Sequence, residues 1–79
     1  MSGPRFLVHT RPDCSFCEKA KNILIAEGFE FDERIHSTQA ERLAFKENLM
    51  SDTFPLIFDL SNNKRVGGYA QLVEYTFML

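Results

Sequence analysis

Two cysteines three positions apart are the residues of this chain best suited to chemistry. Cys14 and Cys17 are its only cysteines, and they stand between an apolar run and a segment with helical periodicity. Residues i and i+3 share one face of a helix, so the two sulfurs should lie close together. Unpaired N–H groups and the helix dipole stabilise a thiolate at a helix N-terminus, and Arg11 adds a fixed positive charge. Because the thiolate is the nucleophilic form, this pattern predicts thiol–disulfide exchange.

The same cysteines allow two other interpretations. Free cysteines are often small buried hydrophobes, although the flanking arginine and the helix start favour a reactive site. A zinc site needs four ligands. The chain has four residues of the types that bind zinc: Cys14, Cys17, His9 and His36. The histidines stand in separate predicted strands without the short spacing of zinc motifs, so we expect no zinc site and structural roles for both.

Length, charge and composition exclude several classes of function. The chain has 79 residues, which predicts one domain over residues 1–79. A net charge of -2 gives no basic patch for nucleic acid, and no apolar run approaches membrane-spanning length. The first residues lack the pattern of a signal peptide, and two cysteines do not make a secreted disulfide framework. We therefore expect a cytoplasmic monomer that binds its substrate in a surface groove.

The elements on either side of the cysteines must position them. Residues 5–10 are short and apolar and predict a buried strand, which Pro12 helps to end. A helix then begins at the first cysteine or one residue later, runs to residue 27 and stops at a glycine. Residues 29–35 alternate between apolar and charged side chains, which predicts an edge strand. Its expected inner face is Phe29, Phe31 and Ile35.

The second half of the chain predicts a helix, a hairpin and a last helix. Thr38 and Glu41 have the spacing of a capping box at the start of a helix that runs to about residue 49. Its expected apolar face is Ala40, Leu43 and Ala44. Residues 55–60 and 64–66 predict two strands joined by a turn, and the last helix follows Gly67-Gly68.

This order, βαβα–ββα, predicts an α/β fold with a mixed four-stranded sheet. A helix crosses between the first two strands, so they must be parallel and their connection right-handed. The first and third helices would cover one face of the sheet, and the second helix the other. A Cys-x-x-Cys at the start of the first helix is typical of a thioredoxin-like fold.

With these motifs the sequence resembles the glutaredoxin family over nearly its whole length. Three segments carry the resemblance in the family's order and spacing: residues 10–17 (Thr-Arg-Pro-Asp-Cys-Ser-Phe-Cys), Thr53-Phe54-Pro55 and Val66-Gly67-Gly68-Tyr69. The second is similar to the family's Thr-Val-Pro, whose proline is cis. The resemblance implies a glutaredoxin fold and a glutathione-dependent thiol–disulfide oxidoreductase. Similar short forms occur in phages.

The resemblance also implies the site, with glutathione as co-substrate in a groove over Cys14. Cys14 would be the nucleophile, assisted by Arg11, and either Cys17 or a second glutathione would resolve the mixed disulfide. The implied glutathione-binding residues are Arg11, Phe16, Arg42, Thr53, Phe54, Pro55, Gly67, Gly68, Tyr69, Ala70 and Gln71. Implied partners are glutathionylated proteins and disulfide-containing proteins such as a ribonucleotide reductase.

The sequence departs from the family pattern at three places. Ala70 and Gln71 replace the Ser, Thr or Asp and the Asp that hold the γ-glutamyl end, so the acidic partner of its amine is missing. One alternative is therefore a redoxin reduced by thioredoxin reductase. Phe16 replaces a tyrosine, and Ser15 replaces the usual proline. Relatives with Ser or Gly there can hold a [2Fe–2S] cluster between two protomers, with Cys14 as the ligand from each chain; otherwise no metal is expected.

Overall fold

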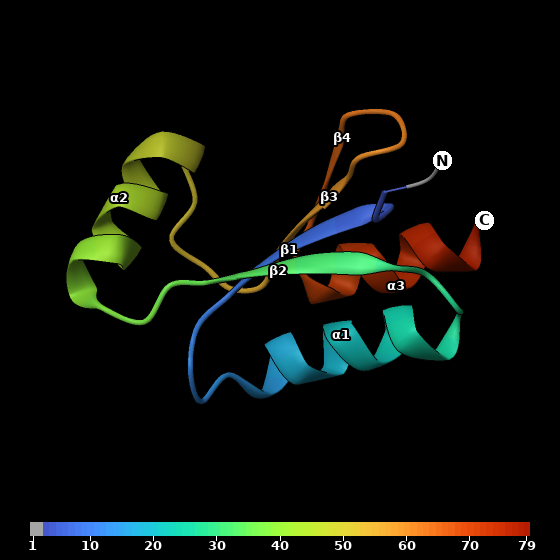
Figure 1. The fold of residues 1–79 in the computed structure, drawn as a ribbon, viewed down its shortest axis with the longest axis horizontal. Helices are drawn as coiled ribbons and strands as arrows, with labels where there is room; N and C mark the ends of the chain where they lie inside the picture. The colour runs from blue at the N-terminus through green and yellow to red at the C-terminus, as the bar shows by residue number, and fades with distance from the viewer. Residues whose placement is uncertain (1–2) are drawn as a thin grey trace.

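Residues 3–79 are described by the computed structural model, and they form a four-stranded sheet in the order β2-β1-β3-β4 (Figure 1). The strands are β1 (Phe6–Thr10), β2 (Phe31–Ile35), β3 (Leu56–Asp59) and β4 (Lys64–Gly67). β1 runs parallel to β2 and antiparallel to β3, and β3 runs antiparallel to β4. This confirms the predicted mixed sheet, with β2 at an edge as its alternating charges indicated.

Within the same residues, three helices complete the βαβα–ββα order. They are α1 (Ser15–Ala26), α2 (Gln39–Leu49) and α3 (Tyr69–Phe77). As predicted, α1 and α3 pack together on one face of the sheet, and α2 lies apart from them on the other (Figure 1). None of these helices is long and apolar enough to cross a membrane.

Short-range sequence signals set the ends of the helices. Gly28 follows α1 with a φ of +78°, a left-handed conformation that glycine adopts without strain. At the start of α2, the Glu41 N–H donates to the Thr38 hydroxyl at 3.1 Å, and the Thr38 N–H donates to the Glu41 carboxylate at 2.9 Å. The predicted capping box is therefore confirmed.

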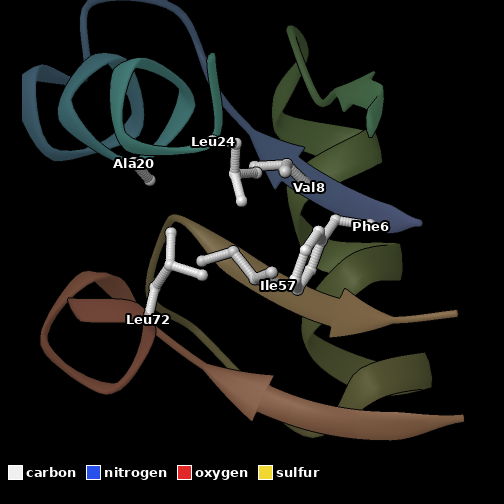
Figure 2. Packing of buried hydrophobic residues seen from close by; sticks show 6 residues of the cluster. All are labelled: Phe6, Val8, Ala20, Leu24, Ile57 and Leu72. Atoms are coloured by element: carbon white, nitrogen blue, oxygen red, sulfur yellow. The ribbon is translucent and has the colours of Figure 1, made fainter. Parts of the chain in front are cut away.

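The hydrophobic core lies between the sheet and the two helices α1 and α3 (Figure 2). Its fully buried members are Phe6, Val8, Ala20, Leu24, Ile57 and Leu72. Phe6 and Val8 face this layer together because successive side chains of a strand point to opposite sides. Burial of each large apolar side chain contributes about 1.5–3 kcal/mol, so this layer fixes α1 and its cysteines against the sheet.

The predicted inner face of the second strand needs correction. Phe29 lies outside β2, and its N–H donates to the Leu24 carbonyl at 2.9 Å where the chain turns back from α1. Its ring still joins the core, edge-on to Phe6 at 5.3 Å between centres. Ile35 was expected on the inner face but is 54% exposed. The apolar alternation therefore holds only for the start of this strand.

One charged side chain of the edge strand β2, that of Glu33, points inward. Glu33 accepts a hydrogen bond from the Thr10 hydroxyl at 2.7 Å and pairs with Lys21 of α1 at 2.9 Å. Desolvation would raise the pKa of Glu33, but these two partners lower it below its ordinary value. A paired carboxylate can thus lie under α1.

The predicted apolar face of α2 is wrong. Leu43 is 54% exposed and both Ala40 and Ala44 are exposed, whereas Phe45 is only 3% exposed. Phe45 stacks on Phe54 with the ring centres 4.4 Å apart. One aromatic side chain, rather than an apolar stripe, therefore attaches this helix, and a single anchor leaves little periodicity in the sequence.

A buried carboxylate connects three segments at the end of the core. Asp59 is fully buried and accepts hydrogen bonds from the Arg5 guanidinium, the Tyr75 hydroxyl, and the hydroxyl and N–H of Ser61. Burial alone would raise the pKa of Asp59. The hydrogen bonds from Arg5, Tyr75 and Ser61 outweigh burial and hold this pKa well below its ordinary value.

We expect Asp59→Asn to lower the free energy of unfolding by about 2 kcal/mol, because hydrogen bonds to a buried charge are worth roughly that much. Urea denaturation at pH 7 measures the change. The difference should shrink as the pH falls below about 4, since the unfolded state then takes up protons that native Asp59 does not. Tyr75→Phe removes one donor and should cost about 1 kcal/mol. Equal stability of Asp59→Asn and the natural chain would contradict this role.

Candidate functional site

The site is built where the loop after β1 enters α1. Asp13 has a φ of 56°, a left-handed conformation that aspartate tolerates, and it turns the chain into Cys14. Cys14 is the N-cap of α1, with extended backbone (φ −119°, ψ 105°). The Cys17 N–H donates to the Cys14 Sγ at 3.3 Å, and the Glu18 N–H donates to the Cys14 carbonyl at 3.2 Å. A first-turn amide therefore points at the sulfur, where the helix N-terminus favours negative charge.

The two sulfurs are not equivalent. Cys14 is 8% exposed and Cys17 is 1% exposed. Burial, reinforced by the contact with Cys14, raises the pKa of the Cys17 thiol to about 12, although Arg11 acts in the opposite direction. Cys17 is thus protonated at neutral pH and shielded, which leaves Cys14 as the sulfur that a disulfide in solution can reach.

The loop before β3 brings a backbone carbonyl to the same sulfur. The Cys14 thiol contacts the Phe54 carbonyl oxygen at 3.9 Å from Sγ. The Phe54–Pro55 peptide bond is cis, as the resemblance implied. The register between β1 and β3 places His9 opposite Leu56, so the residues just before Leu56 lie near the end of β1. An extended peptide could pair here with the backbone of Phe54 like an added strand.

A groove of about 260 Å³ opens beside this contact. Its lining residues come from the first turn of α1, the loop before β3 and the start of α3. They are Phe16, Thr53, Phe54, Pro55, Gly68, Tyr69 and Ala70. All of them belong to the set that the resemblance implied for glutathione, so the fold gathers these predicted residues in one place.

The turn into α3 contributes part of the groove lining. Gly67 has a φ of +117°, which other residues rarely adopt. The Gly68 N–H donates to the Gln71 Oε1 at 3.0 Å, and a Cβ on Gly67 would lie 3.1 Å from the Gln71 side chain. The Gln71 side chain therefore folds back over the two glycines, and its amide oxygen accepts the hydrogen bond of the Gly68 N–H at the start of α3.

Neither arginine of the predicted site lines the groove. Arg11 is exposed, and its guanidinium donates to the Pro12 carbonyl at 3.3 Å. The Arg42 guanidinium donates to the carbonyls of His36 and Ser37 at 3.5 and 3.0 Å. Their roles toward the thiolate and toward a glutathione carboxylate stay predictions.

A histidine pair that the sequence did not predict lies on the α2 side of the sheet. His9 Nδ1 and His36 Nε2 lie 3.0 Å apart. The Phe45 ring centre is 5.3 Å from that of His9 and 4.8 Å from that of His36, and His36 lies 5.6 Å from Phe54. The pair therefore supports the residue whose carbonyl contacts Cys14. One signal was available: His9 stands one residue before the end of the first predicted strand and His36 one residue after the end of the second, and the ends of parallel strands meet at one edge of a sheet.

Across residues 3–79, no three His, Cys, Asp or Glu side chains form a group that could hold a metal ion. His9 and His36 contact each other among the aromatic rings of the α2 side, whereas Cys17 is buried on the inner face of α1.

Comparison with known proteins agrees with this geometry. A family model described as Glutaredoxin matches residues 6–64. The solution structure of a glutaredoxin from Brucella melitensis is 32% identical, with a TM-score of 0.74 over 99% of this chain and 86% of that chain. Glutaredoxin 1 from Francisella tularensis, crystallised with cacodylate, gives a TM-score of 0.84 at 24% identity over 96% of this chain and 95% of that one. The thioredoxin-like fold is thereby confirmed.

One curated relative is much longer than this chain. The hybrid peroxiredoxin hyPrx5 of Haemophilus influenzae is 32% identical over 68 residues, which make up 86% of this chain but 27% of that protein. The chain therefore corresponds to about a quarter of this relative, and the likeness concerns that part alone.

The histidine pair predicts a pH dependence of stability. Burial, with the positive charges of His36 and Arg34, lowers the pKa of His9 to about 4. The unfolded chain binds a proton at this residue below about pH 6.5. The free energy of unfolding should therefore fall as the pH drops from about 6.5 to about 4. Denaturant titrations across this range measure it.

His9→Phe keeps an aromatic ring but removes the titrating group. Its stability should depend less on pH in the same range than that of the natural chain. An identical pH dependence of the two proteins would contradict the assignment to His9.

Proposed function

The chain belongs to the glutaredoxin family, and from that premise we propose that it is a glutathione-dependent thiol–disulfide oxidoreductase. Family membership supports thiol–disulfide exchange in general. The observation that carries the proposal is the unequal cysteine pair: Cys14 caps α1 and touches the Phe54 carbonyl, while Cys17 is buried beneath it. The Cys14 sulfur can therefore react with a substrate disulfide, and the Cys17 sulfur can react with Cys14 afterwards.

The proposed reaction begins with the Cys14 thiolate. It attacks one sulfur of a substrate disulfide, a bond forms between that sulfur and Cys14, and the other sulfur leaves as a thiolate that takes a proton from water. With a protein disulfide, Cys17 loses its proton and attacks the Cys14 sulfur, so the second substrate thiolate leaves and a Cys14–Cys17 disulfide forms. With a glutathionylated protein, Cys14 bonds to the glutathione sulfur and the protein thiolate leaves, and a glutathione thiolate from solution then attacks the sulfur of the bound glutathione and releases the Cys14 thiolate. Two glutathione molecules reduce the Cys14–Cys17 disulfide and end as glutathione disulfide, whereas a glutathionylated substrate consumes one glutathione, which forms glutathione disulfide with the one that the substrate carried.

The raised pKa of Cys17 bears on which route dominates. A thiol that is protonated at neutral pH attacks slowly, whereas free glutathione reaches Cys14 from solution. We propose that glutathionylated proteins are resolved by glutathione and that Cys17 serves protein disulfides, such as that of a ribonucleotide reductase. A reducing compartment rich in glutathione, such as the cytoplasm, fits this chemistry.

The cysteine variants test these roles. Cys14→Ser should abolish the reduction of every disulfide, because the nucleophile is lost. Cys17→Ser should keep more than about half of the rate with a glutathionylated peptide and lose the reduction of an intramolecular protein disulfide. Both rates are followed through NADPH consumption by glutathione reductase. Equal loss in the two variants would contradict the assignment.

A second test concerns the strength of glutathione binding. Ala70 lines the groove where the family places a polar or acidic residue, so the γ-glutamyl amine lacks a carboxylate. Ala70→Asp should lower the KM for glutathione by up to about fivefold, since an exposed ion pair is worth at most about 1 kcal/mol. The gain should shrink at high salt, because exposed charges are screened.

Val73→Asp is the matched control, since it adds the same charge to α3 at a position that is 40% exposed and outside the groove. An unchanged KM in Ala70→Asp at low salt would mean that the γ-glutamyl end is held elsewhere. If the natural chain turns over with thioredoxin reductase and NADPH but not with glutathione, glutathione is not its reductant.

A further inference from the structure

The free edge of β2 takes no part in the proposed reaction. β2 is an outer strand of the sheet, and no strand of residues 3–79 pairs with its other side (Figure 1). The His36 N–H donates to the Thr10 carbonyl at 2.9 Å, which shows the direction of the backbone groups at the end of this strand. Since that direction alternates from residue to residue, the free edge receives the N–H and C=O groups of Phe31, Glu33 and Ile35. Such unpaired groups can form hydrogen bonds with a strand of another chain.

The opposite edge of the sheet is less suited to pairing. The register between β3 and β4 is irregular at Ile57 and Phe58, and β4 ends at Gly67 with its φ of +117°. The Arg65 guanidinium of β4 donates to the Leu49 carbonyl at the end of α2, at 2.7 Å. By contrast, β2 keeps an unbroken register with β1 along its whole length. Irregular edges oppose pairing and regular ones permit it, so β2 is the edge available to a partner.

The side chains of β2 are complementary to a second copy of the same strand. If two copies pair antiparallel about Glu33, Asp32 lies opposite Arg34 of the second copy, and symmetry repeats this ion pair. Both side chains are exposed, and within residues 3–79 neither forms a salt bridge. Phe31 then lies opposite Ile35, whose side chain is 54% exposed in the single chain. Opposite charges and apolar pairs directly across two strands both favour association.

Charge selects this register over its neighbours. A shift by two residues keeps the same backbone groups at the edge, but it places Asp32 opposite its own copy in one direction and Arg34 opposite its own copy in the other. Like charges directly opposite each other oppose association. In the favoured register Glu33 faces its own copy, yet each Glu33 carboxylate pairs with Lys21 of its own chain at 2.9 Å. Two compensated ion pairs, rather than two bare carboxylates, therefore meet at the symmetry axis.

We propose that the β2 edge binds a second copy of this chain, antiparallel about Glu33, and joins two four-stranded sheets into one. None of the residues that line the groove belongs to β2, so this surface is separate from the proposed active site. A single pair of strands buries less area than the interfaces of stable dimers. The two copies should therefore exchange readily, with a dissociation constant of about 0.1 mM.

Sedimentation equilibrium measures this association, with a thiol reductant present to prevent disulfide-linked dimers. Over a range from about 10 µM to about 1 mM at low salt, the average mass should rise from that of one chain, 9.1 kDa, toward twice that value. The association should weaken at high salt, because exposed ion pairs are screened.

Charge reversal tests the register. Arg34→Asp and Asp32→Arg each create two like-charged pairs and should each weaken the association at least about tenfold. An equimolar mixture of the two variants restores opposite charges between unlike chains, so it should associate about as strongly as the natural chain. The double variant Asp32→Arg/Arg34→Asp should do the same. The matched control is Lys46→Asp, which makes the same charge change as Arg34→Asp at an exposed position of α2 and should leave the association unchanged.

A natural chain that stays at 9.1 kDa up to about 1 mM, the monomer expected from the sequence, would overturn the inference. The inference would also fail if both single variants associated like the natural chain, or if neither their mixture nor the double variant recovered the association. Recovery in the mixture would support the register and would show that both single variants are folded.

Discussion

The amide of the first turn of α1 that donates to the Cys14 sulfur is the interaction on which the site depends. An isolated helix of twelve residues is marginal in water, so this amide is held in place only because the inner face of α1 is buried. Ala20 and Leu24 supply that burial against the sheet (Figure 2). The same face buries Cys17, which raises its pKa and separates the roles of the two sulfurs.

The sheet then brings the second half of the site to the first. β1 lies between β2 and β3, so its end is the point at which the loop before α1 and the loop before β3 meet. Phe54 reaches Cys14 from the latter loop, and its ring is held from the other side of the sheet by Phe45 and His36. The helix α2, which buries little else, thus contributes to the site through one aromatic stack.

Features that depend on neighbours in the chain could be predicted from the amino-acid order. The N-cap role of Cys14, the inward position of Cys17 and the capping box of Thr38 and Glu41 each involve residues at most four positions apart. The period of two in β1 and the helical period in α1 follow from backbone geometry, so the fold class and the order of elements were predictable. The cysteine chemistry was predictable for the same reason.

Features that join distant segments depend on how the whole chain folds. The His9–His36 pair, the single anchor Phe45 and the inward turn of Glu33 each depend on which strands become neighbours and where a helix crosses them. The hydrophobic periodicity of one segment does not indicate which distant residues it contacts. The narrow apolar face predicted for α2 was wrong for this reason. The groove likewise exists only because three separate segments converge there, and their side chains give it an uncharged wall.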